Sequence, residues 1–246
     1  MLWSWLRIVA ALAALSGIVA GFIVNVDRAT REGQDLGLVL ANYFSLFTII
    51  SAILTVAALT AAAIWSMRHP GTGREPFGVA LAIAVVTGPV LLLGIVFNVL
   101  LRGEPSGLAL TDPPTIAFLD SWVTEVLHVW LPLYLLVDLL FATRRRGLPW
   151  LSLSVLVGYP ILWILYTMVR GERTTDPSGA PDWWYPYPFL DPHGDGGWAS
   201  AWMYIVVLSA VLLGIGAIVI AIGRIRERRA TRRNETAETA DRELAR

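Results

Sequence analysis

Six long apolar runs divide the chain, and short segments rich in charged residues, proline or glycine separate them. A helix needs about 20 residues to cross a hydrocarbon core of about 30 Å, and each run is long enough. Because lipid offers no partners to exposed backbone groups, such runs are expected to be helical. They cover residues 3–26, 36–65, 77–101, 121–142, 150–169 and 200–223. The pattern predicts an all-α, polytopic integral membrane bundle of six transmembrane helices within residues 1–223.

The first run occupies the place where a secretory signal peptide would lie. Residues 8–26 are long for the apolar part of a signal peptide, and no clear small-residue cleavage site precedes a polar start. We therefore expect a retained helix; a cleaved signal would leave five spans.

The arginines are distributed unevenly, and all 19 basic residues are arginine. Fourteen of them lie in the N-terminal segment, the second and fourth loops and the tail. Positive residues favour the cytoplasmic side, so both termini are expected to be cytoplasmic. The charged tail, residues 224–246, lacks sustained apolar periodicity and is expected to be a disordered cytoplasmic tail.

The fifth loop, residues 170–199, is the longest connection and would then face away from the cytoplasm. Aromatic residues alternate with prolines along it, among them Tyr185, Tyr187 and Phe189. An aromatic belt at the membrane interface is one interpretation. The density of rings and prolines favours an ordered cap that lies on the helix ends.

Composition excludes several classes of protein. Hydrophobic residues make up 56% of the chain and charged residues 15%, too little charge for a soluble surface. The absence of cysteine excludes disulfides, thiolate metal sites and a cysteine nucleophile. No basic face is available for nucleic acid. No metal or organic cofactor is expected, because His193 with Asp191 and Asp195 matches no standard metal site and no phosphate-binding motif occurs.

Polar residues inside the apolar runs are the best candidates for function, because burying them in lipid is costly. On the second run they are Ser45, Thr48, Ser51 and Thr55, and on the fourth they are Ser121, Thr124, Glu125 and His128. Spacings of three and four place each set on one helix face. Asp138 lies further along the fourth run, near its inner end.

Thr48 and His128 could share one depth and form a nucleophile–base pair for acyl transfer. Glu125 lies one turn from His128 and could orient its imidazole. A structural interpretation stands beside this one, since membrane threonines often bond their own helix carbonyls and serine stripes serve helix packing. Asp138 could belong to a proton path or to a buried ion pair.

Three stretches follow one another in a specific order. They are Asn42-Tyr-Phe-Ser-Leu-Phe-Thr48 followed by Ser51, then Leu127-His128-Val-Trp-Leu-Pro132 followed by Asp138, and finally Tyr159-Pro160 through Tyr166 and Arg170-Gly171 to Trp184-Tyr-Pro-Tyr-Pro-Phe-Leu190. Their order resembles that of the androgen-induced membrane proteins, a family that includes the androgen-dependent regulator of tissue factor pathway inhibitor and bacterial relatives. The resemblance runs from the second span through the fifth loop.

The resemblance implies a multi-pass hydrolase that cleaves fatty acid esters of hydroxy fatty acids, with Thr48 and His128 at the positions of the family's catalytic pair. It also implies the plasma (cytoplasmic) membrane of a bacterium. The chain departs from bacterial relatives at Ala52, in a region where they commonly carry asparagine.

Two functions therefore stand as hypotheses. The first is an intramembrane hydrolase of lipid esters, with membrane lipids as partners and a lipid ester as substrate. Its expected supporting residues are Ser45, Ser51, Glu125, Asp138, Tyr185, Tyr187 and Phe189. The alternative is a lipid-binding or transport protein without enzymatic activity, whose polar stripes line a passage. The sequence does not define oligomeric partners.

Overall fold

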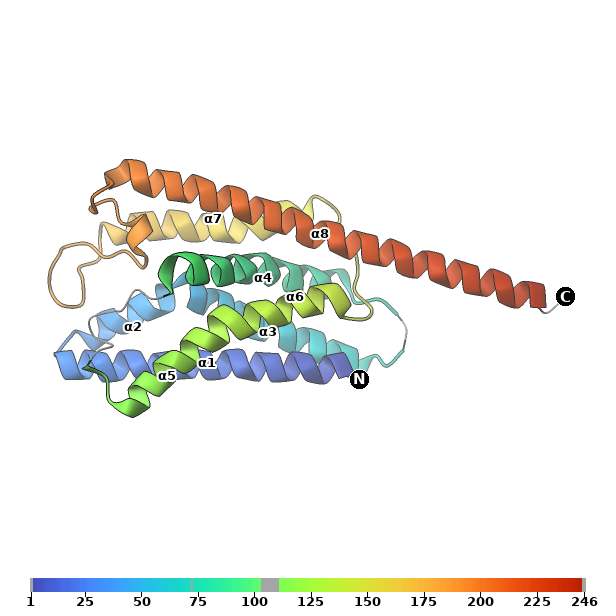
Figure 1. Ribbon diagram of the computed structural model, residues 1–246, viewed down its shortest axis with the longest axis horizontal. Helices are drawn as coiled ribbons and strands as arrows, with labels where there is room; N and C mark the ends of the chain where they lie inside the picture. Colours follow the sequence, from blue (N-terminus) through green and yellow to red (C-terminus); the bar gives the residue numbers. More distant parts are fainter. Residues whose placement is uncertain (1, 72, 103–110, 245–246) are drawn as a thin grey trace.

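The computed structural model describes residues 2–71, 73–102 and 111–244, and this part of the chain is helical without a β-strand. Six helical rods are long and apolar enough to cross a membrane, which confirms the predicted class. They pack side by side, and both termini lie at one end of the bundle, the termini end (Figure 1). The loop after the fifth rod lies at the other, the loop end (Figure 1).

The six rods are made of more than six helical elements. The second rod is broken at one residue, the fourth contains a π-helical turn, and the third ends in a π-helical turn. In order the elements are α1 (Leu2–Glu32), α2 (Leu36–Ser45), α3 (Phe47–Arg68), α4 (Phe77–Val96) with the π-helical turn η1 (Phe97–Leu101), α5 (Pro114–Glu125), the π-helical turn η3 (Val126–Trp130), α6 (Leu131–Phe141), α7 (Ser152–Gly171), the 3₁₀ turn η4 (Pro188–Leu190) and α8 (Gly197–Leu244). Residues 103–110 of the expected third loop lie outside the described part.

The second rod breaks at Leu46, whose backbone is extended with φ −62° and ψ 132°. No proline or glycine marks this break in the sequence. Two side-chain hydrogen bonds flank the break. The Ser45 hydroxyl donates to the Ala41 carbonyl at 2.6 Å, and the Trp163 indole donates to the Ser45 carbonyl at 2.9 Å. Thr48 therefore lies in the first turn of a new helix.

Small residues allow close helix packing in the core. The buried face of α1 presents Ala10, Ala11 and Ala14 toward α3 and α6, and Gly21 faces Tyr43 of α2. A Cβ at Gly21 would lie 2.8 Å from the Tyr43 hydroxyl, so only glycine fits beside this ring. Large apolar side chains instead cover the outside of the bundle, as expected for helices that face lipid.

A buried ionic cluster ties the rods together at the termini end. Arg7 of α1 donates to Asp138 of α6 at 2.9 Å and lies 3.6 Å from Glu75, which precedes α4. Arg145, after α6, donates to the other oxygen of Asp138 at 2.7 Å. All four side chains are at most 3% exposed. Asp138 thus belongs to an ion-pair network that connects four segments of the chain.

The last helix extends into the charged tail. Residues 224–246 are expected to be disordered, whereas α8 continues without a break to Leu244 and projects beyond the other rods (Figure 1). The tail is rich in arginine, glutamate and alanine, which are good helix formers even without an apolar face, and this accounts for its helical backbone.

Candidate functional site

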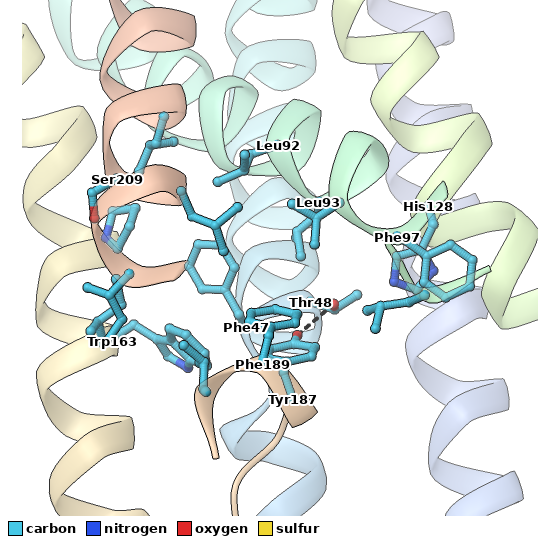
Figure 2. A pocket seen from close by; sticks show the side chains of 18 residues that line it. Phe47, Thr48, Leu92, Leu93, Phe97, His128, Trp163, Tyr187, Phe189 and Ser209 are labelled. Carbon is cyan, nitrogen blue, oxygen red and sulfur yellow. Dashed lines mark hydrogen bonds between the residues drawn. The ribbon is translucent and has the colours of Figure 1, made fainter. Parts of the chain in front are cut away.

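A cavity of about 70 Å³ lies within the bundle, between the broken second rod, the turns η1 and η3, and α8. Its lining includes Thr48, His128, and Tyr187 and Phe189 from the fifth loop, with His128 beside Phe97 and apart from the Thr48–Tyr187 pair (Figure 2). Apolar side chains form the rest of the wall, including Phe47, Leu92, Leu93, Val96, Phe97, Trp163, Ile205 and Leu212. The structure therefore places both predicted catalytic residues on one small, mostly apolar cavity.

Thr48 has a hydroxyl that its own helix does not occupy. Elsewhere in the spans, Thr55 donates to the Ser51 carbonyl at 2.7 Å and Thr87 donates to the Ile83 carbonyl at 2.6 Å. Thr48 lies only one residue into α3, so the break at Leu46 removes the preceding turn that would supply such a carbonyl. Its Oγ1 lies instead 3.2 Å from the Tyr187 hydroxyl (Figure 2).

The serines on either side of Thr48 make similar pairs with tyrosines of α7. Ser45 lies 2.9 Å from the Tyr166 hydroxyl, and Ser51 lies 2.9 Å from the Tyr159 hydroxyl. Neither serine lines the cavity. These two predicted supporting residues therefore join helices, and of the three residues only Thr48 lines the cavity.

His128 lies in the π-helical turn η3, a type of helix distortion that is frequent at functional sites. Its Nδ1 is 3.2 Å from the Thr124 carbonyl oxygen. A carbonyl can only accept, so we assign the proton of the neutral ring to Nδ1. Nε2 then carries the free lone pair. The ring is stacked on Phe97, with centroids 4.0 Å apart, which fixes its plane (Figure 2).

Pro132 explains how the backbone of His128 is held. A residue at this position would normally donate its N–H to the His128 carbonyl, but proline has none. The Asn98 amide of η1 takes over this role and donates to the His128 carbonyl at 3.0 Å. Gly94 allows the approach, since a Cβ there would lie 2.9 Å from Pro132. Asn98 is a positioning residue that the sequence interpretation missed, although Pro132 signalled the unpaired carbonyl.

Glu125 does not bond the imidazole of His128. Its carboxylate accepts from Arg102 at 2.9 Å, and Arg102 also donates to the Asn98 side chain at 2.7 Å. Glu125 thus supports the turn that holds His128 through two intermediates. Asp138 is in the ionic cluster at the termini end and does not line the cavity.

The fifth loop folds onto the loop end and inserts Tyr187 between helices. The Trp184 N–H donates to the Gly171 carbonyl at 3.0 Å. Tyr185 donates to Glu172 at 2.7 Å, and the same carboxylate lies 3.0 Å from His193. A Cβ at Gly171 would lie 2.5 Å from the Tyr185 ring, so glycine is required where the loop leaves α7.

Burial raises the pKa of the Tyr187 hydroxyl, so this group stays protonated at neutral pH. Phe189 stacks parallel to Tyr187, with ring centroids 5.3 Å apart. Burial and the neighbouring Glu172 carboxylate likewise raise the pKa of Tyr185, which fastens the loop but does not line the cavity. Tyr187 therefore offers a hydrogen-bond donor beside Thr48.

Two further features complete the site. Ser209 of α8 also lines the cavity, and nothing in its sequence context distinguished it from other serines. Among the described residues, no three acidic, histidine or cysteine side chains lie close enough together to hold a metal ion. Within the same residues, no hydrogen bond joins Thr48 to His128.

No family model, curated protein or solved structure matches this chain. The interpretation of the site therefore depends on its own chemistry and geometry.

Proposed function

We propose that this protein is an intramembrane hydrolase of lipid esters, with Thr48 as nucleophile and His128 as general base. One observation supports this most directly. A threonine hydroxyl freed by a helix break and a histidine nitrogen with a free lone pair line the same cavity among apolar helices. The resemblance described from the sequence implies the same two residues, but no family model matches the chain, so the proposal depends on the site itself.

The proposed reaction has two steps. Thr48 Oγ1 attacks the ester carbonyl while His128 Nε2 takes its proton, and the alcohol leaves with that proton as the acyl–Thr48 ester forms. A water molecule then attacks this ester, again giving its proton to His128. The carboxylic acid is released and the Thr48 hydroxyl is restored when His128 returns the proton.

Tyr187 suits the role of a hydrogen-bond donor to the oxyanion that forms at the carbonyl. Its hydroxyl is 3.2 Å from Thr48 Oγ1 and stays protonated at neutral pH. A donor placed where negative charge develops stabilises the transition state more than the ground state. Thr48 and His128 are not hydrogen-bonded to each other in the free protein, and catalytic bonds of this kind often tighten only with substrate.

The test uses purified full-length protein in detergent and a fluorophosphonate that reacts with activated hydroxyls. We expect the wild type to be labelled and both Thr48→Ala and His128→Ala to lose labelling. Thr55→Ala is the matched control, because Thr55 is buried in the same helix but donates to its own backbone. Labelling of Thr48→Ala at the wild-type level would overturn the proposal.

A second function is favoured by the Thr48–Tyr187 bond, which occupies the threonine hydroxyl without involving His128. In this alternative the protein binds or transports a lipid without cleaving it. Proteoliposomes that accumulate a labelled lipid without releasing a free acid would support it. Released acid without accumulation would exclude it.

A further inference from the structure

A second and larger cavity lies on the other side of His128. It is a groove of about 570 Å³ between α4, α6 and α8. Apolar side chains line it almost entirely, with Leu91 and Ile95 on α4, Leu133 and Leu136 on α6, and Ile218 on α8. Among the residues that the structure describes, His128 is shared by the walls of both cavities.

The groove opens to the outside of the bundle. Ile95, Leu133 and Ile218 are each more than half exposed on helices long and apolar enough to span a membrane. A groove at this place faces hydrocarbon, because lipid tails surround such helices. Its contents must therefore be apolar.

The length of the groove matches one hydrocarbon chain of a lipid. Along the fourth rod its wall runs from His128 to Leu139, a rise of about 16 Å at 1.5 Å per residue. One leaflet contributes about 15 Å of the hydrocarbon core. The groove extends from His128 toward the termini end. Lipid tails point from the membrane surface toward the midplane, so a chain with its polar end at His128 has the direction of a lipid from the leaflet at the loop end.

The polar atoms of the groove are concentrated at its His128 end. Both N–H groups of the Asn98 amide are already bonded, to the carbonyls of Gly94 and His128. The free Nε2 of His128 therefore remains for a ligand. Gly94 also lines the groove at this end, and its lack of a side chain leaves space where α4 meets Pro132.

We propose that this groove seats the hydrocarbon chain of the substrate, with the ester group beside His128 and the chain end toward Leu139. This proposal depends on the proposed hydrolase function for the ester, whereas binding of the chain itself requires no catalysis. It names the substrate class as an ester with at least one long hydrocarbon chain that enters sideways from the bilayer.

The experiment uses full-length protein in phosphatidylcholine vesicles with a palmitic acid probe that carries a diazirine at its chain end. The wild type and Thr48→Ala are irradiated, and the modified peptides are located by mass spectrometry. Ile218→Trp and Leu133→Trp fill the groove from two different helices. Leu162→Trp is the control, because Leu162 is 67% exposed on α7 and lines neither cavity.

We expect label on groove residues of α6 and α8 near Leu139, equally in the wild type and Thr48→Ala. In the two groove-filling variants the amount of label should fall about tenfold, which corresponds to a loss of about 1.4 kcal/mol in binding free energy. In Leu162→Trp the amount of label should not change. Size-exclusion chromatography of each variant shows whether it is folded, and the result from either folded groove variant is sufficient.

Label spread evenly over all lipid-facing helices and unchanged by both groove variants would overturn the proposal, since the probe would then report bulk lipid only. Loss of hydrolysis in every protein while the groove is labelled as expected would count against the hydrolase function alone.

Discussion

At the scale of single residues, three hydroxyls of the second rod look equivalent, and each has a tyrosine partner. Ser45 and Ser51 pair with tyrosines of α7, whereas Thr48 pairs with Tyr187 from the fifth loop. The difference lies in the cavity, which only Thr48 lines. This contrast separates packing from catalysis experimentally.

Tyr187→Phe keeps the stacked ring and removes the hydroxyl beside Thr48. We expect the rate constant for ester hydrolysis to fall about 100-fold with little change in KM, as for loss of one oxyanion donor. Tyr166→Phe removes the matching hydroxyl from Ser45 and should leave the rate constant near that of the wild type. Equal effects of the two substitutions on kcat would assign Tyr187 a packing role.

At the scale of secondary structure, interruptions of helices create the site. The break at Leu46 frees the hydroxyl of Thr48, and two π-helical turns, η1 and η3, face each other around His128. Asn98 of one turn bonds the backbone of the other. A regular helix in either rod would satisfy its own backbone and would need no such contact.

Pro132→Ala restores the missing N–H and lets the His128 carbonyl bond within its own helix. We expect η3 to shift toward a regular helix, which would move the imidazole and lower kcat about tenfold or more, because a displacement near 1 Å at a reacting group is that costly. The thermal midpoint should stay the same or rise. Kinetics and a melting curve on one preparation test both statements, and an unchanged kcat would show that the proline does not position His128.

At the scale of the whole molecule, the termini end and the loop end are stabilised differently. The termini end is held by the buried cluster of Arg7, Asp138, Arg145 and Glu75. The loop end is closed by the aromatic fifth loop, which packs on Phe47, Trp163 and other core residues. The cavity lies closer to the loop end, so the ionic cluster acts on stability rather than on the reaction.

Arg7→Met removes one partner of Asp138 and Glu75 and leaves buried negative charge. We expect a loss of about 3–5 kcal/mol, as for other broken buried ion pairs, seen as a lower unfolding midpoint in detergent. Arg68→Met, at an exposed position at the end of α3, should change the midpoint little. Protein of either variant that remains folded should still react with the fluorophosphonate. A midpoint of Arg7→Met equal to that of the control would mean that the cluster adds no stability.

Both termini lie at one end of the bundle, and the distribution of arginines predicts that this end is cytoplasmic (Figure 1). In a bacterial host, green fluorescent protein fused after the C-terminus should therefore fluoresce. Alkaline phosphatase inserted after the exposed Gly179 of the fifth loop should be active, because it folds only outside the cytoplasm. The reverse pattern would invert the orientation and place the cavity near the opposite face of the membrane.

The sequence by itself determined the class of the protein and its six spans. Each span depends only on the length and apolar content of one segment, which must match the thickness of the hydrocarbon core. It also identified Thr48 and His128 as the residues to examine, since ionisable and hydroxyl groups are costly in lipid. The helical backbone of α8 beyond its apolar part depends on intrinsic propensity rather than on an apolar pattern.

The tertiary structure alone decided which of these groups meet. Thr48 differs from Ser45 and Ser51 through a helix break that carries no local signal, and its partner Tyr187 is 139 residues away in the chain. Asp138, a candidate for the pocket in the sequence, pairs with Arg7 across 131 residues. Such pairings depend on the rotation and depth of each helix, which result from packing among all rods and not from any one segment.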